Sequence, residues 1–241
     1  MSKKIAFIGC SYAAYDVAGG FKDHWTYLLS LKYPQHTYRN YSKGGQGYDY
    51  FRFCVLDAKM WGADAIFVSS TFTGRHSLLT DHYLSDNTFE FNNLHISDNY
   101  STHDLHQNLL WFAGGEPGSI ATYPWLKRLA YAYAKNILAS DTHIDYNYKW
   151  MANLDKLYNF EKIYTLDFAK DGPHHYKHQK ESVWEMLWRI NNIGLVKKDK
   201  LLAEYGYTVA EDDDHWSPFG HSVVLRDYIL NEDVKNYLEK E

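Results

Sequence analysis

The sequence predicts a three-layer α/β domain, with helices on both faces of a mostly parallel sheet. Three apolar, strand-forming segments, 5–9, 36–41 and 65–70, alternate with two segments that carry apolar residues at helical spacing, 21–31 and 50–60. This β-α-β-α-β order is typical of parallel strands joined by crossover helices. The length of 241 residues allows one domain with a full hydrophobic core.

The regular pattern is interrupted after the third strand. Residues 80–124 are polar, rich in Asn, Asp, His and Gly, and show no sustained period, so we interpret them as an irregular insertion near the functional site, of the kind that serves as a lid. We expect a single domain over residues 1–241. Its remaining elements are expected to be helices at 125–139, 148–159, 181–190 and 197–205, a strand at 162–168, and a closing helical region at 217–239 that is broken near Asn231.

Composition argues against several classes of partner. The formal net charge is −5, whereas duplex-binding proteins usually show a basic face, so no nucleic acid is expected. No run of 18 apolar residues is present, and the apolar segment after the basic Met1–Lys4 is too short for a signal peptide. Cys10 and Cys54 fit a reducing compartment. We expect a cytoplasmic protein without a membrane partner, and the sequence leaves its oligomeric state open.

Aromatic residues are numerous: 22 Tyr, 12 Phe and 8 Trp. Tyr and Trp often fill half-buried positions with their polar end in water, and this interpretation is favoured. The alternative is that aromatic walls stack on a sugar, which makes a glycan ligand worth testing.

The first candidate functional residue is Ser11. It follows an apolar strand and Gly9, and α/β folds place their sites at the carboxyl ends of parallel strands. We interpret Ser11 as a nucleophile; the alternative is a turn residue that caps a helix. Cys10 is a second candidate nucleophile, but its side chain should point the opposite way from that of Ser11, which favours packing.

The second candidate lies near the C-terminus, where Asp212 precedes His215 by three positions. An acid at this spacing can bind the imidazole Nδ1–H, which fixes the tautomer and stabilises the imidazolium form. Asp213 is an alternative acid. The structural alternative is an acidic helix N-terminus, with Ser217 as the N-cap and Pro218 as the first helical residue.

A glycine-rich turn at 42–47 is the third candidate. Gly45 lies five residues after Asn40, and a glycine there allows a backbone N–H to approach a bound oxyanion closely. A plain left-handed turn is the alternative.

Together these stretches resemble the SGNH (GDSL-like) hydrolase family, in block order from end to end. Gly9-Cys10-Ser11 is similar to the first block, with Cys where the family usually has Asp. Asn40 and Gly45 look like the second block. Asp212–His215, followed by Ser217 and Gly220–His221, looks like the last block, which is the most specific part of the resemblance.

The resemblance implies a flavodoxin-like sheet and a catalytic triad. Ser11 would attack an ester, His215 would act as general base and then general acid, and Asp212 would orient His215. The backbone N–H groups of Ser11 and Gly45 would form the oxyanion hole. The mechanism implied for this family needs no metal and no organic cofactor.

The third block departs from the family, which usually shows Gly-x-Asn-Asp after the third strand. This chain has Ser69–Arg75 there, with no Asn. Thr73 falls near the Asn position and is the candidate third oxyanion donor. Arg75 can act as a charged donor or hold an anionic substrate. Loss of one oxyanion donor typically costs on the order of 10²–10³ in rate.

The function expected from the resemblance is hydrolysis or transfer of an acyl group on a small polar or carbohydrate ester, through an acyl-serine intermediate. The alternative is a non-catalytic module of the same fold that binds glycans or serves in assembly, for example in a virus particle. The absence of the third-block Asn motivates this alternative.

Three further patterns were weighed. Asp171–His174 is a second Asp-x-x-His, but it lacks the Ser-x-x-Gly-His that follows the first. His174, His175 and His178 are candidate metal ligands, although a solvated loop is favoured because no acid stands at a convincing spacing. The first strand is followed by neither Gly-x-Gly-x-x-Gly nor a phosphate loop, which argues against a nucleotide-binding domain.

Overall fold

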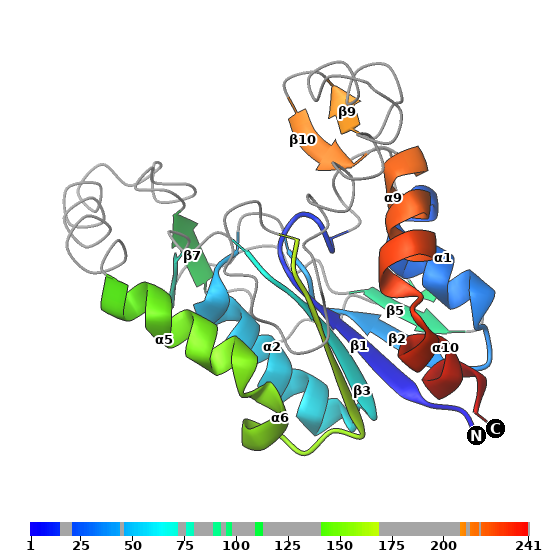
Figure 1. Cartoon of the computed structure of the whole chain (residues 1–241), viewed down its shortest axis with the longest axis horizontal. Helices are drawn as coiled ribbons and strands as arrows, with labels where there is room; N and C mark the ends of the chain where they lie inside the picture. Colours follow the sequence, from blue (N-terminus) through cyan, green and yellow to red (C-terminus); the bar gives the residue numbers. More distant parts are fainter. Residues whose placement is uncertain are drawn as a thin grey trace.

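The described part of the chain forms three layers, with a sheet between two layers of helices (Figure 1). The prediction of a three-layer, mostly parallel α/β fold is confirmed. The computed structural model describes residues 1–14, 21–43, 46–71, 76–79, 89–92, 95–97, 109–112, 141–168, 208–210, 213–216 and 218–240.

The main sheet has six strands in the order β6-β5-β2-β1-β3-β8. Four neighbouring strands are parallel to one another: β2 (Thr37–Asn40), β1 (Lys4–Ile8), β3 (Ala65–Ser69) and β8 (Lys162–Leu166). Their chain order, 2-1-3 followed by the next parallel strand, is that of flavodoxin-like sheets. The strands β5 (Phe89–Asn92) and β6 (His95–Ser97) extend the sheet beyond β2 and run antiparallel.

Two small antiparallel pairs lie outside the main sheet. The strand β4 (His76–Leu79) pairs with β7 (Leu109–Phe112), and β9 (Thr208–Ala210) pairs with β10 (Asp213–Trp216). Together with β5 and β6, β7 lies within the stretch for which the sequence pattern predicted no regular structure. These strands have three or four residues each, which is too short for a hydrophobic period to show.

The strand β1 is buried on both faces because helices cover both sides of the sheet. Ile5, Ala6, Phe7 and Ile8 are all 0% exposed. A strand in this position can be a continuous apolar run rather than an alternating one, which is the pattern read from the sequence.

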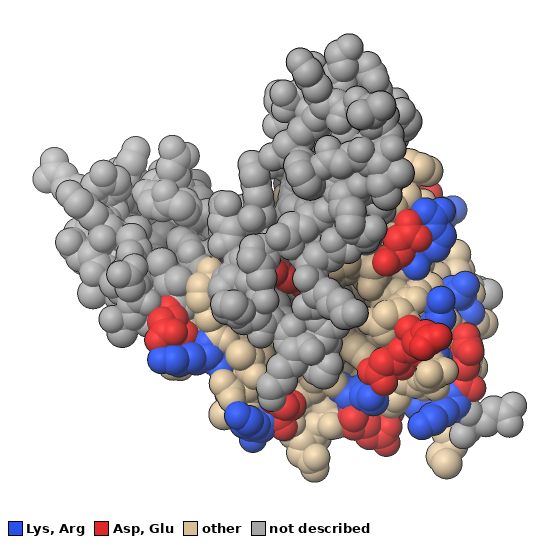
Figure 2. Space-filling model, viewed as in Figure 1, with Lys and Arg blue, Asp and Glu red and all other residues tan. Residues whose placement is uncertain are grey.

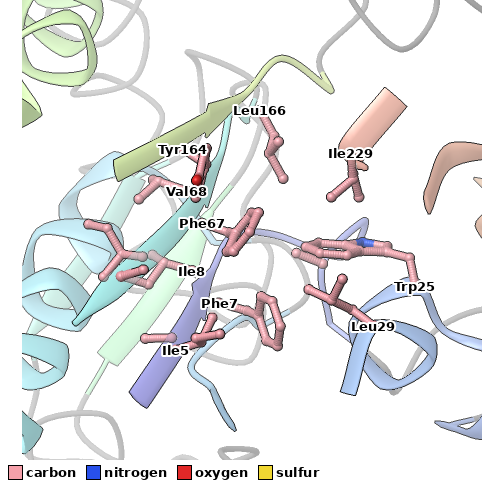
Figure 3. Close-up of a cluster of buried hydrophobic side chains, with 14 of the residues drawn as sticks. Ile5, Phe7, Ile8, Trp25, Leu29, Phe67, Val68, Tyr164, Leu166 and Ile229 are labelled. Carbon is pink, nitrogen blue, oxygen red and sulfur yellow. The ribbon is translucent and has the colours of Figure 1, made fainter. Parts of the chain in front are cut away.

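One face of the sheet carries a tightly packed aromatic core. Phe7 and Phe67 point toward Trp25, whose ring meets that of Phe7 edge-on at a centroid distance of 5.2 Å (Figure 3). Leu29 and Ile229 close the cluster from the helical layer (Figure 3). This packing fixes the first helix and the C-terminal helical region against the central strands.

The helices divide between the two faces (Figure 1). One face is covered by α1 (Trp25–Lys32), preceded by the short 3₁₀ turn η1 (Phe21–Asp23), and by the closing helical region. That region consists of α9 (Pro218–Val224), the π-helical turn η4 (Leu225–Ile229) and α10 (Glu232–Glu239). The other face is covered by α2 (Tyr48–Trp61), α5 (Asp141–Ala152) and α6 (Leu154–Leu157).

The helix α2 ends at a glycine that the backbone requires. Gly62 has φ +79°, in the left-handed region, and its N–H donates to the carbonyl of Lys59 while that of Ala63 donates to Ala58. These are the two bonds of a Schellman motif.

The helices α2 and α5 contact each other through Arg52, whose guanidinium lies over the rings of two α5 residues, Tyr146 and Trp150, at 4.6 and 5.0 Å.

Residues at the start of the chain hold the end of α10. The Lys3 ammonium donates to the carbonyls of Tyr237 and Lys240, at 2.8 and 3.0 Å. The ring of His36 accepts the Lys3 N–H at Nδ1, so its Nε2 donates to Leu238 O at 2.9 Å. These groups satisfy carbonyls that a helix leaves without partners at its C-terminus.

The predicted helix at 50–60 is correct to within two residues, whereas that at 148–159 is wrong in its start and its continuity: α5 begins at Asp141 and ends at Ala152, and α6 follows as a separate short helix. The segment predicted as one helix from residue 21 is the turn η1 followed by α1, because His24 has an extended backbone (ψ 142°) and caps α1. The closing region is broken at Leu230–Asn231, as predicted, and α9 begins at Pro218. The predicted helices at 125–139, 181–190 and 197–205 lie outside the described residues.

Charges of both signs are mixed on the face shown in Figure 2, where Lys and Arg lie beside Asp and Glu over the described elements. Lys162 of β8, for example, pairs with Asp233 of α10 at 2.8 Å. None of the described helices combines the length and the apolar character needed to cross a membrane.

Candidate functional site at the carboxyl edge of the sheet

The candidate site lies where the parallel strands end. From β1 the chain passes to β2 on one side, and from β2 it crosses to β3 on the other side of β1. This change of direction makes the carboxyl ends of β1 and β3 the topological switch point. Buried polar side chains gather at this edge, at most 6% exposed: Ser11, Asn40, Ser42, Gln46, Ser69, Ser70, Thr71 and Asp167. A protein interior seldom collects so many polar groups without a structural or functional reason.

Ser11 lies in a tight turn directly after β1. The backbone N–H groups of Ala13 and Ala14 both donate to Cys10 O, at 2.9 and 3.0 Å, so residues 11–13 form the beginning of a helical turn. Ser11 is 6% exposed. No hydrogen bond joins its hydroxyl or its backbone N–H to any residue that the structure describes.

Cys10 packs into the interior. It is 0% exposed and belongs to the core cluster, with its sulfur 3.9 Å from Ser70 O. The packing role favoured by the sequence is confirmed.

Gly9 leaves room for the Ser69 side chain and for the turn that follows β1. A Cβ built at Gly9 would lie 2.0 Å from Ser69 Oγ and 2.8 Å from Ala13 Cβ. Real Cβ atoms do not approach other heavy atoms so closely, so only glycine fits between the end of β3 and the turn that carries Ser11.

Asn40, at the end of β2, braces the same turn. Its amide nitrogen donates to Ala13 O at 2.9 Å, and its amide oxygen accepts the N–H of Ser42 at 2.9 Å. Its side chain is 0% exposed. Asn40 was predicted as a site residue from its spacing to Gly45, and its contacts give it a structural role of its own.

The C-terminal block meets this loop through Trp216, the last residue of β10. The Trp216 ring lies 5.0 Å from that of Tyr12 and 4.9 Å from that of Phe168, measured between centroids. Trp216 is 1% exposed. His215 therefore belongs to a strand whose next residue contacts the neighbour of Ser11, although only its backbone is among the described atoms.

Two buried histidines, one of them beside Trp216, were not assigned a role from the sequence. His221 of α9 meets Trp216 edge-on at 5.5 Å, and its ring centroid is 4.2 Å from that of His24. Burial lowers the pKa of His24 well below its ordinary value of 6.5, and the proximity of His221 lowers it further. His221 stands within the quoted C-terminal block, whereas nothing in the sequence marks its partner His24.

The ends of β3 and β8 carry a second arrangement that sequence reasoning missed. Ser70 Oγ donates to Asp167 Oδ1 at 3.0 Å and accepts the N–H of Phe168 at 2.9 Å. Thr71 Oγ1 donates to Gln46 O at 3.1 Å. Both hydroxyls after β3 are therefore engaged with other parts of the protein.

Several predicted site residues fall outside the described residues: Gly45, Thr73, Arg75 and Asp212, together with the Asp171–His174 motif and the histidines 174, 175 and 178. Asp213 is described only by its backbone, in β10. Among the side chains that are described, no three His, Cys, Asp or Glu residues gather in a way that could hold a metal ion.

The described residues thus bring the first and last sequence blocks to one edge of the sheet. Ser11 and Tyr12 come from the N-terminal strand, and Trp216 and His221 come from the closing segment. Comparison of the chain with protein-family models, with curated proteins and with solved structures finds no match in any of the three.

Proposed function

We propose that the chain is a serine hydrolase of SGNH type that cleaves or transfers an acyl group. The observation that carries this proposal is the contact between Tyr12 and Trp216, at 5.0 Å between ring centroids. The two residues adjoin Ser11 and His215 in sequence. A nucleophile and a base from opposite ends of the chain need such a contact between their segments to work together.

In the proposed reaction, the Ser11 oxygen attacks the ester carbonyl carbon and His215 takes the hydroxyl proton. His215 then returns this proton to the departing alcohol, which leaves an acyl-serine. Water, or an acceptor alcohol, then gives a proton to His215 while its oxygen attacks the acyl carbon. His215 returns this proton to the Ser11 oxygen as the acyl group is released. Asp212 orients His215 and stabilises its charged form.

The proposed oxyanion hole consists of the backbone N–H groups of Ser11 and Gly45, with Thr73 as the third donor. The Ser11 N–H has no hydrogen-bond partner among the described residues, which supports this role. Arg75 is the proposed contact for an anionic or polar substituent. The mechanism uses no metal and no organic cofactor.

The proposed substrate is a small polar or O-acylated carbohydrate ester. The abundance of aromatic residues supports this choice, since Tyr and Trp rings stack on sugars and keep a polar end for their hydroxyls. A reducing compartment such as the cytoplasm is proposed as the place of action, in keeping with Cys10 and Cys54, which are free thiols.

A non-catalytic module of the same fold, for glycan binding or assembly, is the second candidate. One observation favours it: the two described hydroxyls that follow β3, on Ser70 and Thr71, are already bonded to Asp167 and to Gln46 O. Neither is free to replace the amide donor that the third block usually supplies.

Labelling with a fluorophosphonate tests the proposal, because this reagent reacts with activated serines. We expect labelling of the wild type at Ser11 and none in Ser11→Ala. Ser42→Ala is the matched control: Ser42 lies at the same edge, is 1% exposed, and its hydroxyl has no hydrogen-bond partner among the described residues. This control should be labelled at the wild-type rate.

A wild type that stays unlabelled, while a control serine esterase reacts, would contradict the hydrolase and favour the binding module. Hydrolysis of p-nitrophenyl acetate provides a second measurement. Wild type should exceed Ser11→Ala, and Ser11→Ala should run at the rate of buffer alone.

A further inference from the structure

Two fully buried imidazoles face each other between α1 and α9. The His24 and His221 rings lie 4.2 Å apart between centroids at an interplanar angle of 48°, and the residues are 0% and 1% exposed. Buried histidine pairs are costly once either ring is charged, because the charge loses its hydration and repels a second charge on the neighbour.

The cap of α1 requires an unprotonated Nδ1 on His24, and burial, the largest influence, lowers the His24 pKa even though a hydrogen bond with the Tyr12 backbone raises it. Its Nδ1 accepts the backbone N–H of Thr26 at 3.2 Å, which caps α1. The Thr26 hydroxyl lies 2.8 Å from the same nitrogen and is itself approached by the Asn40 amide at 3.5 Å. A backbone N–H can only donate, so Nδ1 must act as an acceptor, and a doubly protonated ring would lose the cap.

His221 links this pair to the candidate site. It lies edge-on to Trp216, and Trp216 lies against Tyr12, next to Ser11. His221 follows His215 by six positions on the same segment. The segment that carries His215 is thus connected through His221 to the start of α1.

We propose that His24 and His221 are positioning residues that hold β10 and α9, and with them His215, against the Ser11 turn while the His24 ring is uncharged. The role in positioning His215 rests on the proposed function, whereas the docking of 213–224 does not. Burial and the proximity of His221 both lower the pKa of His24, in agreement with this requirement for a neutral ring.

No described carboxylate is among the groups that shift the pKa of His24, and the buried Asp167 carboxylate accepts from Ser70 Oγ. The charged side chains of η1 and η4 are all exposed, and Arg226 donates to its neighbour Asp227 at 2.6 Å. Tyr12 and Tyr228 are buried, and ordinary phenols are neutral below pH 8. The titratable groups on the elements around the pair are Lys22 and Asp23 in η1, Lys32 and Tyr27 in α1, Arg226, Asp227 and Tyr228 in η4, and Tyr12. The side chains of Asp213, Asp214 and His215 in β10 lie outside the described atoms.

The sign of the pH effect follows from linkage. A histidine with a lowered folded pKa stays neutral in the docked segment but takes up a proton once the segment opens, if the pH is below 6.5. Docking is therefore complete above pH 6.5 and weakens as the pH falls. Because a histidine in the open segment is already half protonated at about pH 6.5, opening of residues 213–224 should rise about fivefold between pH 6.5 and pH 5.5 as His24 becomes charged on opening.

Hydrogen exchange followed by mass spectrometry tests this on the full chain. We expect exchange of peptides from 213–224, corrected for the intrinsic effect of pH, to accelerate about fivefold from pH 6.5 to 5.5, while β1 and β3 peptides stay protected. His24→Asn keeps an N-cap acceptor and removes the titrating ring, so its acceleration should be about fivefold smaller. His36→Asn is the matched control, because His36 is also buried, with a lowered pKa, but binds Leu238 O in α10.

Exchange of 213–224 that does not change with pH in the wild type overturns the proposal, and this measurement requires no variant to fold. Loss of the response in His36→Asn together with its full retention in His24→Asn also overturns it. Fluorophosphonate labelling at pH 7.5 separates the two proposals: labelled wild type with pH-independent exchange contradicts only the histidine pair. Unlabelled wild type with pH-dependent exchange contradicts the hydrolase and supports the docking role.

Discussion

Replacement of Asn40 by Asp is expected to lower the free energy of unfolding by on the order of 3–5 kcal/mol at pH 8, measured by urea denaturation. The side chain is 0% exposed and its nitrogen donates to Ala13 O. A carboxylate there would be a buried charge facing a carbonyl oxygen. Asn40→Ala is the comparison variant, because it leaves two backbone groups without partners at about 1–3 kcal/mol each but introduces no charge.

The pH dependence distinguishes the two variants. A protonated carboxyl can donate to Ala13 O and accept from Ser42 N, as the amide does. The folded pKa of the new Asp would be raised above its unfolded value near 3.9, so stability relative to wild type is lost as the pH rises above 4. The deficit of Asn40→Asp should therefore shrink from pH 8 to pH 5, while that of Asn40→Ala stays constant. A constant deficit in both variants would contradict the role given to Asn40.

Replacement of Gly9 by Ala is expected to cost about 2–3 kcal/mol in unfolding free energy and to displace the Ser11 turn. The new methyl group would overlap Ser69 Oγ at 2.0 Å and Ala13 Cβ at 2.8 Å. The Ser69 hydroxyl can rotate or be removed, whereas Ala13 belongs to the turn itself. Displacement of that turn should also abolish fluorophosphonate labelling of Ser11.

Ser69→Ala provides the control for this prediction. The Ser69 hydroxyl has no hydrogen-bond partner among the described residues, so its removal alone should change stability little. In the Gly9→Ala/Ser69→Ala double variant, part of the lost stability should return because the shorter contact is gone. Labelling should not return, because the Ala13 contact persists. Full recovery of both properties would show that Ser69 alone sets the need for glycine.

The central strands could be predicted because burial on both faces leaves a continuous apolar record in the sequence. Ala65–Ser69 is such a run, and all five residues are buried. The edge strand β6, His95–Ser97, has no such record: it is polar at both ends and exists through pairing with β5. Its formation depends on tertiary contacts rather than on local preference.

The candidate site was predictable in part. The strand, glycine and serine of residues 4–11 correctly indicated a turn at the carboxyl end of β1. The pairing of Ser70 with Asp167 was not predictable from periodicity, because it depends on β3 lying beside β8. Once Ser69 is known to face Leu166 in the sheet, the next residues of both strands are brought together.

His24 shows the same limit in a single residue. Histidine is not among the side chains usually expected to cap a helix. It does so in this protein because its ring nitrogen accepts from Thr26 while its other face meets His221, almost the whole chain away in sequence. The local sequence of residues 21–31 therefore could not indicate that His24 contacts His221.

The fastening of α10 by Lys3 and His36 has a consequence for biosynthesis. The strand β1 precedes Ile229 and the helices that cover one of its faces by most of the described chain. During translation, this apolar strand must remain without that cover until residues 218–239 have been made. The sheet's central strand is thus synthesised long before the helices that shield one of its faces from water.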